Sequence, residues 1–393
     1  MTKQRRSLVQ GRLLGIGVAV FSAASALLVS SAVLAKDYGK PGTPVHLVIG
    51  YQPYYTQAWS AVIQKEMKPW EKYLPKGSTV EWEIGLQGAI IGNAMLADKN
   101  DIGYMGDMPT IVAISKQSVR ELRMVAVLGL ANDQCSVFLS RNEAPDFKTP
   151  EEAVKWWQGK RVAVAKGSCT DRSGQETMRK FGITPEQYLN QNIEVQTSNF
   201  KAGRLDGSII WEPTASKIIL EGIAKRVGDT KMIGKLDGGF MAMQHELIKQ
   251  RPDVVKGWLE AELDANIFWS KPENYIKVVE MALKNTQGFS KEALWMSMAG
   301  KYPKSMGGGD FRNIMYYGFD KDVMTMIGDA TAFLNEIKVL PMAQLPKELI
   351  DTSWTDEILK KRNLKVPLAR IQAQEPSKYP DGKITLPATW RKD

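Results

Sequence analysis

The chain has 393 residues, enough for two domains of ordinary size, and its hydrophobic content of 44% supports a substantial core. Four of its nine net positive charges lie in the first 35 residues, on Lys3, Arg5, Arg6 and Arg12, where no acid occurs. The remaining +5 is mild for this size, and no basic stripe interleaves with aromatic residues. Composition therefore gives no case for a nucleic-acid-binding protein.

Residues 1–35 are predicted to be a signal peptide. Basic residues come first, a small and apolar run follows from Leu13 to Val29, and residues 31–35 offer small side chains for cleavage. The run is too weakly hydrophobic for a permanent span, which argues against an N-terminal membrane anchor. We expect a soluble protein in the periplasm, exported by the general route or, given Arg5-Arg6, by the twin-arginine route.

From residue 45 onward, strands and helices are predicted to alternate. Strands are expected over 45–49, 80–84, 102–105 and 122–128, with helices over 58–70, 88–97 and 109–116. A second cycle has strands over 136–139, 162–165 and 209–211, a helix over 149–157, a helix that ends near 181, and helical residues near 200. Thr149 is the expected N-cap of the 149–157 helix, with Pro150 at its first position. This alternation is typical of an α/β fold with a mostly parallel sheet.

The last third of the chain is predicted to be mainly helical. Helices are expected over 253–269, 273–284, 291–298 and 321–337, with a flexible break at Gly307-Gly308-Gly309. The tail over 341–393 is rich in Pro and Lys and is predicted to be a C-terminal extension of unassigned role.

Two stretches, residues 97–110 and 202–214, look like versions of one another. Each combines a helix end, a turn with an Asp, a short apolar strand, and then an acid and a proline that open a new helix. Ligands of open α/β sheets sit beyond the carboxyl ends of strands. The pair therefore predicts two similar lobes that face one ligand.

Four acids are predicted near that ligand: Asp107, Asp133, Asp171 and Glu212. A carboxylate in the first turn of a helix is often a favourable cap, and this alternative stays open for Asp107 and Glu212. In a cleft, the four acids favour an ammonium, guanidinium or zwitterionic ligand over a bare anion, because a desolvated cation needs an opposite charge nearby.

The loop at residues 166–171 supplies a second group of candidates. Ser168, Cys169 and Thr170 lie between a predicted strand and a helix, where free N–H groups and a hydroxyl suit a polar ligand end. Simple helix capping is the alternative. The chain has two cysteines, Cys135 and Cys169, and an oxidising compartment permits either a disulfide or two thiols.

Aromatic and amide side chains complete the candidate site. The aromatic ones could wall a small ligand or fill the core, and the amides could exchange hydrogen bonds with it. They are Tyr51, Tyr54, Tyr55, Trp59, Tyr104 and Trp211, together with Gln52 and Gln87.

Catalytic interpretations find little support. No phosphate-binding loop and no HExxH helix occurs. A Ser/His/Asp triad would need His46, which lies inside a predicted strand, or His245, which opens a predicted helix far from any Gly-flanked serine. Two cysteines and two histidines leave little material for a metal or haem site, so no cofactor is predicted.

Several ordered motifs resemble one known family. They are Ile49-Gly50-Tyr51-Gln52, Asp101 to Pro109, Gly159 to Ser168, and Gly203-Arg204-Leu205-Asp206 leading to Trp211-Glu212-Pro213. Together, over about residues 45–300, they resemble the periplasmic solute-binding proteins of ATP-binding-cassette (ABC) importers for nitrate, aliphatic sulfonates and taurine. An acid at Asp171 departs from what a simple anion ligand would suggest.

This resemblance implies a two-lobed fold that closes by a hinge around a ligand. Lobe 1 would comprise 45–130 plus 233–340, and lobe 2 would comprise 131–232. The protein would be a non-enzymatic monomer that hands a small solute to an inner-membrane ABC permease. The acids favour an amine, guanidinium-like or taurine-like ligand; the alternatives are an alkyl sulfonate or nitrate receptor and a pyrimidine-forming enzyme like those of thiamine synthesis.

Overall fold

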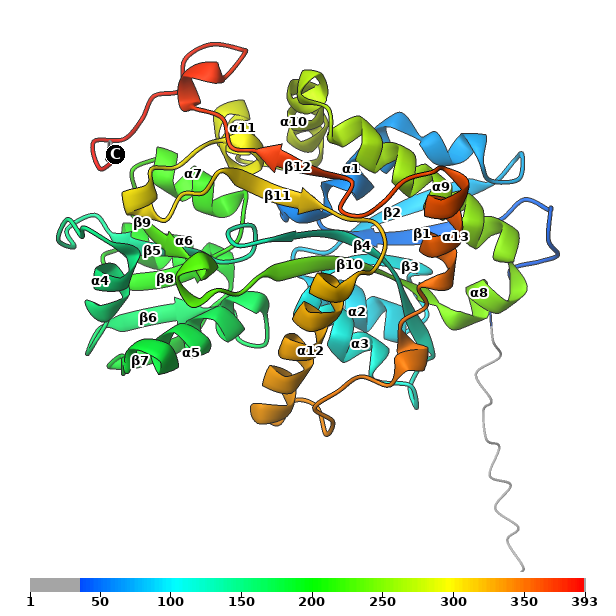
Figure 1. Ribbon diagram of the computed structural model, residues 1–393, viewed down its shortest axis with the longest axis horizontal. Helices are drawn as coiled ribbons and strands as arrows, with labels where there is room; N and C mark the ends of the chain where they lie inside the picture. Colours follow the sequence, from blue (N-terminus) through cyan, green and yellow to red (C-terminus); the bar gives the residue numbers. More distant parts are fainter. Residues whose placement is uncertain (1–35, 392–393) are drawn as a thin grey trace, which may run out of the picture. The chain divides into compact units, whose positions relative to one another are not determined.

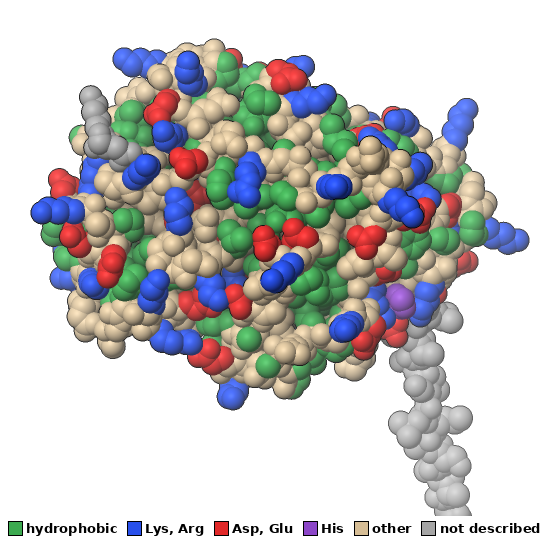
Figure 2. All heavy atoms as spheres, viewed as in Figure 1, with side chains coloured by type: hydrophobic (Ala, Val, Ile, Leu, Met, Phe, Trp, Pro, Cys, Tyr) green, Lys and Arg blue, Asp and Glu red, His purple; other side chains and the backbone are tan. Residues whose placement is uncertain are grey.

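The structure is a computed structural model that describes residues 36–391, so the predicted signal peptide lies outside the described residues. Two sheets, each flanked by helices, form two lobes (Figure 1). The two-lobed α/β fold is thus confirmed. On the face seen in Figure 2, basic and acidic side chains are mixed.

Lobe 1 is built on seven strands. They are β1 (His46–Tyr51), β2 (Thr79–Ile84), β3 (Ile102–Gly106), β4 (Leu122–Ala131), β10 (Asp237–Gln244), β11 (Phe311–Met315) and β12 (Ala369–Gln372). Its helices are α1 (Trp59–Met67), α2 (Gly88–Leu96), α3 (Asp107–Ile114), α8 (His245–Gln250), α9 (Pro252–Trp269), α10 (Tyr275–Asn285), α11 (Lys291–Ala299), α12 (Lys321–Glu336) and α13 (Ser353–Lys361).

Lobe 2 is built on five strands. They are β5 (Val137–Arg141), β6 (Arg161–Val164), β7 (Gln187–Asn190), β8 (Gly207–Ile210) and β9 (Ala224–Asp229). Its helices are α4 (Pro150–Lys155), α5 (Cys169–Phe181), α6 (Ile193–Lys201) and α7 (Thr214–Leu220). As predicted, the Thr149 side chain caps α4 by accepting the Glu152 N–H, and Pro150 holds the first helical position.

Both sheets are mixed, whereas the sequence predicted mostly parallel ones. The strand order is β12-β11-β4-β10-β3-β1-β2 in lobe 1 and β7-β6-β8-β5-β9 in lobe 2. The pairs β1–β2, β1–β3, β6–β7 and β6–β8 are parallel, as βαβ units require. Antiparallel pairs also occur. Next to the crossings between lobes, β10 runs against β3 and β4, and β5 runs against β8 and β9. At the other edge of the lobe 1 sheet, β11 runs against β4 and β12.

Two crossings form the hinge. Residues 132–136 lead from β4 to β5, and residues 230–236 lead back from β9 to β10. The crossings are bonded to each other, because Asn132 donates to the Lys235 carbonyl at 2.7 Å and accepts from the Thr230 N–H. The two crossings therefore lie side by side and together connect the lobes.

The C-terminal extension is packed on both lobes. β12 adds an edge strand to lobe 1 beside β11, and Lys361 and Arg362 at the end of α13 contact Glu260 of α9. Farther on, the Trp390 ring lies 5.2 Å from that of Tyr302, and Arg391 lies 3.9 Å from Asp146 of lobe 2. The tail therefore spans from one lobe to the other.

Candidate functional site

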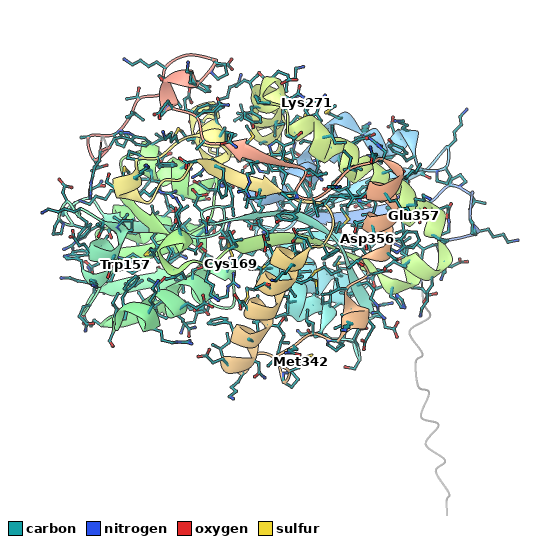
Figure 3. The ribbon with its side chains drawn as sticks, viewed as in Figure 1. Trp157, Cys169, Lys271, Met342, Asp356 and Glu357 are labelled. Atoms are coloured by element: carbon teal, nitrogen blue, oxygen red, sulfur yellow. A yellow bond between two sulfur atoms is a disulfide. The ribbon has the colours of Figure 1, made fainter. Side chains whose placement is uncertain are left out.

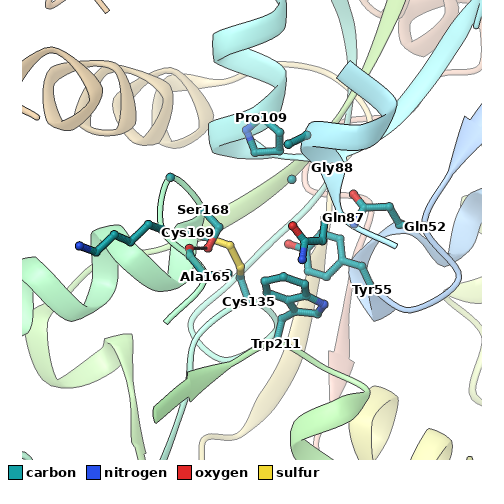
Figure 4. A pocket seen from close by; sticks show the side chains of 14 residues that line it. Gln52, Tyr55, Gln87, Gly88, Pro109, Cys135, Ala165, Ser168, Cys169 and Trp211 are labelled. Carbon is teal, nitrogen blue, oxygen red and sulfur yellow. Dashed lines mark hydrogen bonds between the residues drawn. A yellow bond between two sulfur atoms is a disulfide. The ribbon is translucent and has the colours of Figure 1, made fainter. Parts of the chain in front are cut away.

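A cavity lies between the lobes at the carboxyl ends of strands from both sheets (Figure 4). Lobe 1 supplies residues after β1, after β2 and at the end of β3; lobe 2 supplies residues after β6 and β8; and the hinge supplies Cys135. The lining residues are Gln52, Tyr55, Gln87, Gly88, Ala89, Gly106, Pro109, Cys135, Ala165, Lys166, Gly167, Ser168, Cys169 and Trp211. This is the position where open α/β folds bind ligands.

The cavity is small. Its volume is about 70 Å³. A space of this size holds more than one water-sized group. Such a space suits a compact solute that both lobes can enclose.

Three helices begin at the cavity wall: α2 at Gly88, α3 just after Gly106, and α5 at Cys169. Ser168 caps α5 by accepting the Thr170 N–H, whereas the Gln87 side chain makes no capping bond to α2 in the described chain. The α2 backbone also comes very close to α3, because a Cβ on Gly88 would lie 2.5 Å from Pro109 Cγ. First-turn N–H groups and the helix dipoles favour negative charge at this spot.

The side chains at the cavity are neutral, apart from Lys166, which is exposed and holds its Nζ 5.6 Å from the centre of the Tyr188 ring. Gln52 Oε1 and Trp211 Nε1 are buried without a hydrogen-bond partner among the described residues. Burial raises the pKa of Tyr55 well above its usual range, so its phenol is uncharged. The two unpartnered atoms offer one acceptor and one donor to a ligand.

The four predicted acids are buried, and none of them is among the described residues that line the cavity. Asp107 accepts from Arg172 at 3.1 Å, and Glu212 accepts from Arg312 at 2.7 Å. Asp133 pairs with Arg226 and Arg312, and Asp171 accepts from the Gly167 N–H, Gln175 and Tyr188. Burial raises the pKa of Asp107 and of Glu212, and the arginine beside each opposes that shift.

Three of the six predicted aromatic residues form core rather than cavity wall, and a fourth, Tyr54, is half-buried outside the cavity lining. Trp59 is fully buried and donates to the Pro53 carbonyl, and Tyr51 bonds to Asn285 and Lys65. Tyr104 bonds to Glu262, while the Tyr54 hydroxyl accepts from the Gln287 N–H outside the cavity. Large rings after strand ends serve packing here, because most of their area can be removed from water only in the core.

The structure therefore divides the fourteen predicted ligand-binding residues into two groups. Six line the cavity: Gln52, Tyr55, Gln87, Ser168, Cys169 and Trp211. Eight lie outside its lining: Tyr51, Tyr54, Trp59, Asp107, Asp133, Thr170, Asp171 and Glu212. Residues missed by the sequence reasoning are mainly small wall residues such as Ala89 and Pro109 and the buried arginines, Arg172, Arg226 and Arg312. Pro109 stood in a quoted motif, but the arginines gave no local signal.

Cys135 and Cys169 form a disulfide in the cavity wall, which settles the alternative left open by the sequence. Figure 3 places Cys169 near the middle of the molecule. Neither histidine lines the cavity. Residues 36–391 contain no group of acids, histidines and cysteines suited to a metal ion, and none of their helices has the length and apolar character to cross a membrane.

Comparisons with known proteins agree with this fold. The taurine-binding periplasmic protein of Escherichia coli is 25% identical over 251 residues, which cover 61% of this chain and 73% of that protein. The fold matches the alkanesulfonate-binding protein SsuA of Xanthomonas axonopodis pv. citri, with a TM-score of 0.63, 18% identity, and coverage of 80% of this chain and 99% of SsuA. It also matches the nitrate-binding protein NrtA of Synechocystis, with a TM-score of 0.64, 14% identity, and coverage of 82% and 90%. The model of the NMT1-like family matches residues 40–283, and the chain belongs to that family.

Proposed function

We propose that the protein is the periplasmic solute-binding component of an ABC importer, and that its ligand carries a small anionic head group, a sulfonate above all. The observation that carries this proposal is the interlobe cavity itself, which meets strand ends from both lobes and three helix N-termini. A ligand that touches both lobes stabilises the closed form, and an inner-membrane permease then receives it.

The charge of the wall favours an anion over the cation that the acids first suggested. Asp107, Asp133 and Glu212 each pair with a buried arginine, and Asp171 bonds within its own lobe. These carboxylates therefore leave little negative charge for an ammonium or guanidinium ligand. The open N-terminus of α2 attracts negative charge instead.

The cavity volume sharpens the choice of ligand. A cavity of about 70 Å³ suits a compact solute such as nitrate, a short alkyl sulfonate or the zwitterion taurine. The Gln52 Oε1 acceptor is available to an amine at the far end of such a molecule. Taurine and short sulfonates are thus the preferred candidates, with nitrate as the alternative.

Titration calorimetry with matched ligands tests the proposal. Taurine and ethanesulfonate share the sulfonate, whereas ethylamine and guanidinium carry positive charge without it. We expect the sulfonates to bind and to stabilise the protein by about 2.7 kcal/mol at a hundredfold excess over the dissociation constant. Tighter binding of ethylamine or guanidinium would reverse the charge assignment. The absence of heat with every compound, nitrate included, would remove the importer role.

A further inference from the structure

The disulfide between Cys135 and Cys169 joins the hinge to the start of α5, and it does so in the wall of the cavity. Cys135 belongs to the crossing from β4 to β5, and Cys169 is the first residue of α5. Both residues line the cavity, and their exposed fractions are 1% and 5%. Figure 4 shows the bond beside Trp211.

We propose that this disulfide is a redox switch of the ligand site, opened by thiol reductants that enter through the interlobe cavity. The proposal rests on the proposed function for the identity of the ligand but not for the route of the reductant. Thiol–disulfide exchange depends on access to a sulfur atom, and the cavity is the space that both cysteines line.

The chemistry needs one external dithiol. Its thiolate attacks Cys135 Sγ, the bond between the two cysteines breaks, and Cys169 leaves as a thiolate. The second thiol of the reductant then attacks the mixed disulfide and releases Cys135, so the reductant is oxidised as the protein gains two thiols. Departure from Cys169 is favoured because the thiolate forms at the N-terminus of α5, where the helix dipole stabilises negative charge.

Reduction matters for the ligand because the hydrogen bonds that cavity residues 165–168, which precede α5, make within the described chain all lie in lobe 2, among them one from the Lys166 N–H to Asn190. The Ser168 N–H and hydroxyl both donate to the Ala165 carbonyl, and the Gly167 N–H donates to Asp171. A second tie to the hinge segment exists, since Ser136 and Ser173 hydroxyls lie 2.7 Å apart. We therefore expect the reduced protein to keep its fold but to hold the cavity wall less firmly.

Linkage makes the switch reciprocal. If reduction weakens ligand binding by some factor, ligand must disfavour reduction by the same factor. We expect a factor of about ten, which corresponds to about 30 mV for this two-electron couple. A bound ligand should also slow reduction directly, because it fills the route to the sulfur atoms.

The route is tested on the full chain without any ligand. Reduction by dithiothreitol, followed by alkylation and mass spectrometry, is compared between Ala89→Trp, which adds bulk at the cavity wall, and Asn93→Trp, one turn along the same exposed face of α2 but outside the cavity lining. We expect at least threefold slower reduction in A89W and an unchanged rate in N93W. Equal rates in the two variants would overturn the proposal, even if no sulfonate ever binds.

The second arm uses taurine, or whichever compound binds in the calorimetric screen. We expect saturating ligand to slow reduction and to shift the dithiol–disulfide equilibrium, and the reduced protein to bind about tenfold more weakly with an unchanged circular dichroism spectrum. Equal affinity of the oxidised and reduced proteins would overturn the switch. Chemical reduction needs no cysteine variant, so a folding defect in such a variant cannot decide the result.

Discussion

The two related stretches, residues 97–110 and 202–214, each place a buried acid directly after a residue that lines the cavity, and they differ in what that residue presents to the cavity. In lobe 1, Gly106 lines the cavity and the next residue, Asp107, turns back into the protein; in lobe 2, Trp211 and Glu212 do the same. Each acid is bound by an arginine of the opposite lobe, Asp107 by Arg172 and Glu212 by Arg312. The repeated acids therefore join the lobes to each other.

The difference lies in the residue before the acid. Gly106 offers backbone at the start of α3, whereas Trp211 offers an aromatic ring whose N–H has no partner among the described residues. At these two positions, lobe 1 thus presents the start of a helix and lobe 2 presents a side-chain donor. An anionic head that lies at the start of α2 and also accepts from the Trp211 N–H is the arrangement that this asymmetry favours, because it leaves Gln52 Oε1 to an amine.

Breaking the two arginine contacts should produce the largest effects, and unequal ones. Arg312 serves two carboxylates and the Ser297 carbonyl, whereas Arg172 serves one carboxylate and the Leu236 carbonyl. Losing one partner of a buried ion pair costs about 3–5 kcal/mol, because the other charge stays buried. We expect Arg312→Met to lower the free energy of unfolding toward the upper end of this range and Arg172→Met toward the lower end, as measured by urea denaturation.

Arg179→Met is the matched control. Its ion pair with Glu336 also links the lobes, but both side chains are more than half exposed. Exposed pairs contribute about 0–1 kcal/mol, so R179M should change stability little. If all three variants lost similar stability, burial would not explain why the Asp107–Arg172 and Glu212–Arg312 ion pairs stabilise the protein.

A smaller effect is expected at Asp237, where the hinge re-enters lobe 1. This carboxyl is fully buried, and burial raises its pKa well above the usual range, with Asp107 adding to the shift and Arg172 opposing it. The folded protein then holds a proton that the unfolded chain has lost, so the free energy of unfolding falls as pH rises above about 3.8. Asp237→Asn should remove this loss, worth about 1.4 kcal/mol for each unit of pKa shift.

Denaturation of wild type and D237N between pH 4 and 8 measures this directly: the variant should gain relative stability toward high pH. Asp206→Asn should behave in the opposite way. Hydrogen bonds from Arg161 hold the pKa of Asp206 below its usual value against the opposing effect of burial, so its contribution is present at neutral pH and is lost as pH falls. Parallel pH profiles for the two variants would contradict the assignment.

The sequence predicted the fold and the approximate position of the site better than the roles of individual residues. Gln52, Gln87 and Trp211 follow strand ends, and strand ends of an α/β sheet can be located from hydrophobic patterns. The direction of Asp107 could not be read, because Arg172 lies 65 residues away and nothing local marks the pair. Much of the wall is main chain at Gly88 and Gly106, which leaves no side-chain signature.

The smallest expected effect concerns Trp211, the lobe 2 counterpart of Gly106. Its Nε1 is buried without a partner among the described residues, so Trp211→Phe deletes a donor that a ligand would use and costs the empty protein little. A net hydrogen bond contributes about 0.5–1.5 kcal/mol, or up to roughly tenfold in affinity.

Trp59→Phe is the matched control. It deletes an N–H that donates to the Pro53 carbonyl, so it should lower stability and leave affinity unchanged. Calorimetry and thermal unfolding of both variants separate these outcomes. Unchanged affinity in W211F would mean that the ligand contacts lobe 2 through Ser168 and the start of α5. The difference between Gly106 and Trp211 would then concern the packing of the Trp211 ring alone.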